Sequence, residues 1–265
     1  MTEQVITGAR RGAQRAIGGL RAATAVLTKV PVGAAPLQTE DQLWAPVCFP
    51  IVGAGVGLAA GAIYLAFRGV GELPAAALAV SASLLLTGAL HEDGLADTAD
   101  ALGGASTPER LFAILKDSRT GSFGAAAVAI TVLLRVSLIA ALGAAGGWAL
   151  VLVHAAARLA PVALMTALPY VSDPMNRKNA ALERPTRERA SLACLFPLAL
   201  LVATIGLGWL SLVSALVFLS LGALMTMYLG HRFKARAGGY TGDFLGATEQ
   251  LVECALLLAL ALMAP

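Results

Sequence analysis

The sequence predicts an all-α fold: a polytopic integral membrane helical bundle of about seven transmembrane helices, with residues 1–265 forming a single membrane-embedded domain. Hydrophobic residues make up 58% of the chain, compared with roughly 45 to 50% in soluble domains. Mean hydropathy is +0.77. Apolar runs of about 20 residues, the length that crosses a bilayer, recur along the chain. These observations argue against a soluble globular protein.

The elements follow from these runs and from the polar segments between them. Residues 1–47 are expected to form an N-terminal cytoplasmic or interfacial segment, with residues 16–30 lying along the membrane surface. The last run is short and the breaks near Gly146 and Gly208 are tight, so six or eight spans also fit. The predicted spans are residues 48–67, 73–90, 123–145, 148–170, 191–208, 210–230 and 251–264.

Basic residues predict the orientation of these spans. Sixteen of the nineteen Lys and Arg residues lie before residue 30 or in residues 91–122, 171–190 and 231–250. By the positive-inside rule these four segments are cytoplasmic, and the last three are expected to be loops. Topology and anionic lipid explain the net charge of +3. With no nucleic-acid motif present, a nucleic-acid partner is not expected.

The stretch HEDGLADTADALGG, residues 91–104, contains the clearest chemical motif. Asp93, Asp97 and Asp100 are spaced i, i+4, i+7, so their carboxylates lie within about 60° on one side of a helix. Like charges placed in this way repel, and hard divalent cations prefer clustered carboxylate oxygens. The alternative is an acidic first turn that faces water, but Asp100 lies too deep in the helix for that. The motif therefore predicts a Mg²⁺ site.

The stretch LKDSRTGSFG, residues 115–124, is a candidate phosphate site. Lys116 and Arg119 flank the hydroxyl of Ser118, and the backbone N–H groups near Gly121 begin the next apolar helix. Cationic side chains and free N–H groups at a helix start suit a phosphate. An ordinary juxtamembrane anchor is the alternative.

The stretch GGYTGDFLGATEQLVE, residues 238–253, contains similar residue types, with glycines around Thr241 and Asp243. Glu253 is expected inside the membrane boundary, where an ionised carboxylate needs a partner. Arg135 and Arg158, which also lie in spans, are candidate partners. Either a structural ion pair or support of an active site would explain Glu253.

Histidine, cysteine and glycine residues add less. His91 precedes the acidic helix and could orient a carboxylate or act as a base, or could be structural. His154 and His231 lie in no cluster, and the three cysteines have no spacing that would bind zinc. A tandem GxxxG in the first span predicts a close helix-packing face formed by Gly53, Gly57 and Gly61.

The three polar stretches resemble the motifs of the cobalamin synthase family, also called adenosylcobinamide-GDP ribazoletransferases. The resemblance extends to ATAVLTKVPV near residue 30 and to FPIVGAGVGLAAG at residues 49–61, so it covers most of the chain. Glu92 replaces a usual apolar residue and Ala101 replaces a glycine, but neither change removes an expected ligand. Residues 171–190 match poorly.

The resemblance implies a multi-pass enzyme of the inner membrane, with its site facing the cytoplasm, that acts in the last stage of cobalamin synthesis. It would join adenosylcobinamide-GDP to α-ribazole, or to α-ribazole 5′-phosphate, and release GMP with the help of Mg²⁺. A homo-oligomer would be compatible with this. The expected metal ligands are Asp93, Asp97 and Asp100; the expected catalytic residues are Asp243, Lys116, Arg119 and His91; and the expected substrate-binding residues are Ser118, Gly121, Thr241 and Gly242.

Two other functions fit parts of the pattern. A CDP-alcohol phosphotransferase or an aspartate-rich prenyltransferase also uses Asp clusters and Mg²⁺ at a membrane face, but the first would have DGxxAR where Asp97 and Thr98 stand here. A transporter would line a midplane cavity with charges such as Arg135, Arg158 and Glu253. Most acids lie instead in the predicted cytoplasmic segments, which disfavours transport.

Overall fold

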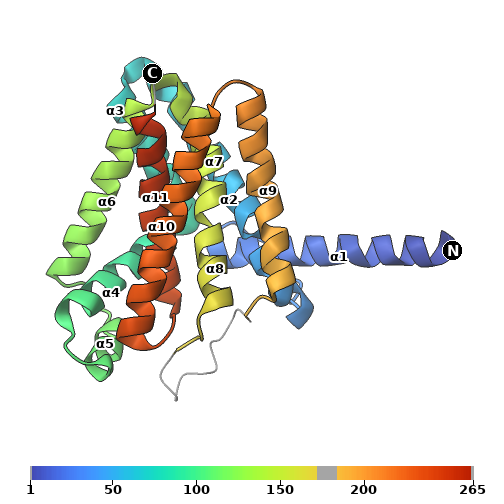
Figure 1. Cartoon of the computed structure of the whole chain (residues 1–265), viewed down its shortest axis with the longest axis horizontal. Coiled ribbons are helices and arrows are strands. Elements are labelled where there is room, and N and C mark those ends of the chain that lie inside the picture. Colours follow the sequence, from blue (N-terminus) through green and yellow to red (C-terminus); the bar gives the residue numbers. More distant parts are fainter. Residues whose placement is uncertain (1, 172–183, 264–265) are drawn as a thin grey trace.

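The computed structural model describes residues 2–171 and 184–263, and these residues are mainly helical (Figure 1). The helices in chain order are α1 (Thr2–Leu27), α2 (Thr39–Phe67), η1 (Arg68–Val70), α3 (Glu72–Thr87), α4 (Leu90–Gly104), α5 (Pro108–Leu115), α6 (Ser122–Ala141), η2 (Gly143–Ala145), α7 (Gly146–Ala157), α8 (Leu159–Ala167), α9 (Arg187–Gly206), α10 (Leu212–Ala237) and α11 (Gly242–Leu262).

The long helices run side by side, while α1 runs across their direction (Figure 1). Six segments of the described chain are long and apolar enough to cross a membrane, and α3 with α4 would make a seventh that is bent by 90°. The prediction of an all-α membrane bundle with about seven spans is therefore confirmed.

The tandem GxxxG of α2 forms the predicted packing face. A Cβ atom at Gly53, Gly57 or Gly61 would collide with backbone atoms of α7. Small residues at these positions let the two helix backbones approach closely, which favours van der Waals packing where water supplies no driving force. This contact places α7, and the interruption between α7 and α8 that follows it, beside α2.

The bend between α3 and α4 positions the acidic helix. Gly88 and Ala89 have φ values of 66° and 56°, in the left-handed region that ends a helix. The backbone N–H of Lys29 donates to the carbonyl of Leu86 at 2.7 Å, so the chain after α1 packs against this corner. Because of the bend, α4 turns away from the direction of α3 and lies outside the six spanning segments.

Several predicted boundaries were wrong. Residues 231–250 are mainly helical, because α10 continues to Ala237 and α11 begins at Gly242, well before the predicted start of the last span. The predicted loop 91–122 contains α4, as the helical spacing of its aspartates predicted, and also α5, which was not predicted. Apolar runs reveal only the lipid-compatible part of a helix, so polar turns at its ends look like loop. Residues 172–183 of the predicted loop 171–190 lie outside the described residues.

Candidate active site

The acid-bearing helices α4 and α11 cross at two glycines. A Cβ atom at Gly94 would lie 2.8 Å from the carbonyl oxygen of Asp243, and one at Gly246 would lie 3.3 Å from the Cα of His91. Only glycine permits this approach without a shift of the backbone. The crossing brings Asp243 to the acidic face of α4, so the structure brings the first and third acidic stretches together.

The start of α11 fixes Asp243 in the first helical turn. The Thr241 hydroxyl accepts a hydrogen bond from the Phe244 N–H at 3.2 Å and so caps the helix. The ring of Phe244 is buried and stacks on Phe233 of α10, with 4.2 Å between ring centroids. Thr241, an expected substrate-binding residue, therefore has a capping role here, while Gly242 is exposed beside Asp243.

The four aspartates form one electrostatic cluster. Asp93 is exposed, Asp97 is half-buried and Asp100 is buried. Burial, followed by the negative charges of Asp243, Asp93 and Asp100, raises the pKa of Asp97 to about 6. No Lys or Arg of the described chain forms an ion pair with Asp93, Asp97 or Asp243. Carboxylate oxygens gathered without a cationic partner fit a hard divalent cation.

Asp100 has local partners that the sequence did not reveal. Its Oδ2 atom accepts the N–H of Gly121 at 2.7 Å, and its Oδ1 atom accepts the N–H of Gly124 at 2.9 Å. The Asp100 carboxylate thus caps α6 and fastens that helix to α4. The N–H group of Gly121, expected to meet a phosphate, is already used.

Of the remaining expected phosphate contacts, Arg119 borders a cleft beside Asp100. This cleft, of about 440 Å³, is lined by Asp100, Asp117, Arg119 and Gly121, among others. Arg119 is largely exposed and pairs with Asp117 at 2.6 Å. Hydrogen bonds from the side chain and backbone of Arg119 lower the pKa of Asp117 to about 2. Lys116 and Ser118 are exposed nearby.

A pocket of about 220 Å³ lies where the acid-bearing helices meet. Its apolar walls come from α1, α2 and α8, which the sequence could not assign to the site, and include Val26, Leu27, Phe49 and Pro161. Its polar lining consists of His91, Asp93, Arg158, Asp243 and Glu249. Of these five, Glu249 and Arg158 were not expected at the site. The pocket therefore combines two members of the acidic cluster with a buried cation.

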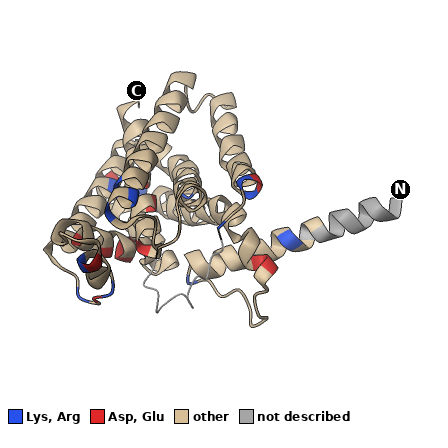
Figure 2. Ribbon diagram, turned by 60° about the horizontal axis from the view of Figure 1, so that its bottom comes forward, with Lys and Arg blue, Asp and Glu red and all other residues tan. Residues whose placement is uncertain are grey.

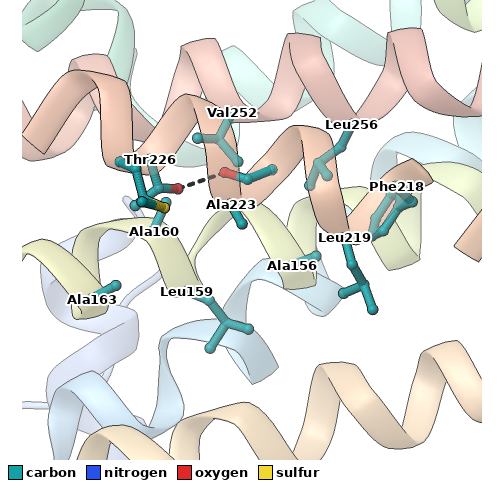
Figure 3. Close-up of a pocket in the computed structure, with 12 residues that line it drawn as sticks. Ala156, Leu159, Ala160, Ala163, Phe218, Leu219, Ala223, Thr226, Val252 and Leu256 are labelled. Atoms are coloured by element: carbon teal, nitrogen blue, oxygen red, sulfur yellow. Dashed lines mark hydrogen bonds between the residues drawn. The ribbon is translucent and has the colours of Figure 1, made fainter. Parts of the chain in front are cut away.

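A third cavity, of about 330 Å³, lies between the α7–α8 segment, α10 and α11 (Figure 3). Its lining is almost wholly apolar, and the hydroxyl of Thr226 donates to the carbonyl of Gly222 at 2.7 Å. With no charged group in its lining, this cavity does not suit a diphosphate.

Behind the pocket, Arg135 ties several helices together. Its Nε donates to Glu253 at 2.8 Å, its Nη1 donates to Glu92 at 2.8 Å and to Gln250 at 3.1 Å, and its Nη2 donates to Ser83 at 2.9 Å. These residues come from α3, α4, α6 and α11. The expected pairing of Glu253 with Arg135 is confirmed.

His154 lies in a second buried cluster, contrary to the prediction that it belongs to none. A ring nitrogen of His154 and one carboxylate oxygen each of Glu249 and Glu253 lie within 4.8 Å of one another. Arg158 lies 2.9 Å from Glu249, and Arg135 pairs with Glu253, so guanidinium groups already offset both carboxylates. This cluster therefore suits a divalent cation less well than the unpaired aspartates do.

Comparison with known proteins identifies the family. The model of the family described as cobalamin-5-phosphate synthase matches residues 19–261. A protein of Bradyrhizobium diazoefficiens is 39% identical over 92% of this chain and 94% of its own length, and one of Pseudomonas aeruginosa is 38% identical over 94% of this chain and 100% of its own length. A protein of Polaromonas sp. is 36% identical over 80% of this chain and 83% of its own length.

All three relatives carry the name adenosylcobinamide-GDP ribazoletransferase. No solved structure matches the chain. The resemblance seen in the three polar stretches is confirmed over most of the sequence, and the chain belongs to the cobalamin-5-phosphate synthase family.

Proposed function

We propose that this chain is a transferase of the last stage of cobalamin synthesis that joins adenosylcobinamide-GDP to α-ribazole and releases GMP. The relatives' name supplies the substrates. The crossing of α4 and α11, which brings Asp93 and Asp243 to one pocket and places Asp97 in the same electrostatic cluster, is the observation that carries the proposal. Such a site suits a metal-bound diphosphate better than a transported solute.

Asp93, Asp97 and Asp243 are the residues that would hold Mg²⁺, because their carboxylates share one cluster and have no cationic partner in the described chain. When bound, Mg²⁺ would neutralise charge on the phosphoryl oxygens of the diphosphate. We assign Asp100 to positioning, since both of its oxygens already accept backbone N–H groups.

The transfer exchanges the phosphoanhydride bond of the diphosphate for a new phosphoester bond. A free ribose hydroxyl oxygen of α-ribazole attacks the phosphorus nearer cobinamide, the bond from that phosphorus to the bridging oxygen breaks, and GMP leaves with that oxygen. The hydroxyl proton passes to a base in the pocket, for which Asp243 and His91 are the candidates. Arg119, which lines the second cleft, and Lys116, which is exposed and close to Arg119 in the chain, are assigned to the outer part of a long substrate. The same site would accept α-ribazole 5′-phosphate.

We place the pocket at the cytoplasmic face of the inner membrane. The basic residues that define the inside by the positive-inside rule flank α4, α5 and the end of α10, and these elements border the acidic site. Both substrates are charged or polar and would reach the site from the aqueous side.

GMP release by the purified protein tests the proposal. The protein in detergent is given adenosylcobinamide-GDP and α-ribazole, with Mg²⁺ or with EDTA, and GMP is measured. We expect GMP release to require both substrates and Mg²⁺. If the detergent-solubilised protein is folded, as judged by cooperative unfolding, and yet releases no GMP, the proposed activity is refuted. GMP release in EDTA would refute the requirement for Mg²⁺. CDP-diacylglycerol, offered in parallel, should yield no CMP.

A further inference from the structure

Arg158 lies where the segment from Gly143 to Ala167 breaks. Helix α7 ends at Ala157 and α8 begins at Leu159. Gly53 of α2 makes room for the arginine, since a Cβ atom there would collide with the Arg158 Cδ. The Arg158 side chain is buried, with 1% relative exposure, yet it contributes to the lining of the pocket that Asp93 and Asp243 border.

The two buried arginines use their donors differently. Arg135 donates from Nε, Nη1 and Nη2, so all three of its nitrogens are satisfied. Within the described residues, Arg158 makes every contact through Nη1: with the carbonyl of His154 at 2.9 Å, with the ring of His154 at 3.2 Å and with Glu249 at 2.9 Å. Its Nε is buried without a partner.

A buried guanidinium with unused donors is unfavourable unless an acceptor arrives. The planar guanidinium group matches the geometry of phosphoryl oxygens and can bind two of them at once. Among the residues that line this pocket, Arg158 is the one Lys or Arg. Lys116 and Arg119 are not in that lining, and Arg119 borders the other cleft. The pocket thus has acids for a metal and one cation for an anion.

We propose that Arg158 is a catalytic residue of the transfer, whose free Nε and Nη2 donors bind an anionic oxygen of the diphosphate in the pocket of Asp93 and Asp243. The inference rests on the proposed function for the identity of the substrate, but its chemistry requires only a magnesium-bound diphosphate. Because Glu249 and His154 already hold the guanidinium group in place through Nη1, its free donors would stabilise the charge that develops on the phosphoryl oxygens without reorganising.

Binding of inorganic pyrophosphate tests this role apart from activity. The full-length protein is titrated with pyrophosphate at saturating Mg²⁺, and Mn²⁺ binding is measured separately by electron paramagnetic resonance. In Arg158→Gln we expect pyrophosphate to bind about tenfold more weakly or worse, with Mn²⁺ affinity unchanged. Arg158→Lys keeps a charge beside Glu249 and serves if the Gln variant does not fold; it should show the same selective weakening, because Lys lacks the guanidinium fork.

Arg68→Gln is the matched control, since Arg68 pairs with Glu72 outside the pocket. It should bind both ligands like the parent. Parent-like pyrophosphate affinity in Arg158→Gln or Arg158→Lys would overturn the inference. So would a parallel loss of Mn²⁺ and pyrophosphate, which would indicate a purely structural arginine. Selective weakening in a protein that releases no GMP would instead refute the proposed function and leave the diphosphate site standing.

Discussion

Asp97 experiences the charge of every other member of the aspartate cluster. Replacing it with Asn keeps the shape of the side chain and removes its charge. We expect Asp97→Asn to lower GMP release by at least about a hundredfold, because the carboxylate strengthens the binding of the metal ion that stabilises the transition state. The variant should stay in the membrane fraction. Glu40→Gln, which removes an exposed carboxylate paired with Arg15, is the control and should keep its activity. Near-parental turnover of Asp97→Asn at saturating Mg²⁺ would argue against the metal assignment.

Asp243 and Asp97 come from different helices but share one electrostatic environment. If they serve one Mg²⁺-diphosphate unit, removing both should cost little more than removing the worse one, because groups that act as a unit are strongly non-additive. We predict that the double Asn variant lies within about tenfold, or roughly 1.4 kcal/mol, of the weaker single variant. Multiplied losses, measured above background in folded protein, would mean that the start of α11 serves another step.

At the scale of elements, the sequence predicts features that lie within one helix but not the contacts between helices. The spacing of Asp93, Asp97 and Asp100 is a property of one helix, so the sequence sufficed to place them on one side of it. The Asp100 contact with Gly121 and the role of Arg158 depend on which helices pack together, and no periodic pattern encodes that. Gly94 could have been noticed as a glycine inside an acidic helix, but its partner on α11 could not.

The α4–α11 crossing predicts a steric effect. In Gly94→Ala the new Cβ would lie 2.8 Å from the Asp243 carbonyl, so one of the two helices must shift. We expect GMP release to fall at least about tenfold, because small displacements of catalytic groups are costly. Gly55→Ala in α2, where a Cβ meets nothing within 4 Å, is the matched control. Equal activity of the two variants would show that the crossing tolerates separation.

At the scale of the whole molecule, charge is distributed unevenly. Long stretches of the bundle helices carry no charged residue, whereas charged residues gather around α4 and α5 and where the bundle meets α1 (Figure 2). Turns at the other end, such as Gly208 and its neighbours, are nearly uncharged. A membrane protein with this asymmetry is expected to keep its charged end inside the cell, which would also give the polar substrates access to the acidic pocket.

This orientation can be measured with single cysteines at the two ends. In a variant lacking Cys48, Cys194 and Cys254, Ser106→Cys would lie between α4 and α5, and Gly69→Cys would lie in η1 at the far end of α2. Both positions are exposed, so both thiols should react once the membrane is opened. In intact spheroplasts treated with an impermeant thiol reagent, we expect Gly69→Cys to be labelled and Ser106→Cys to be protected. The reverse pattern would place the acidic pocket outside the cell, away from cytoplasmic GMP metabolism, and would contradict both the topology and the proposed location of the site.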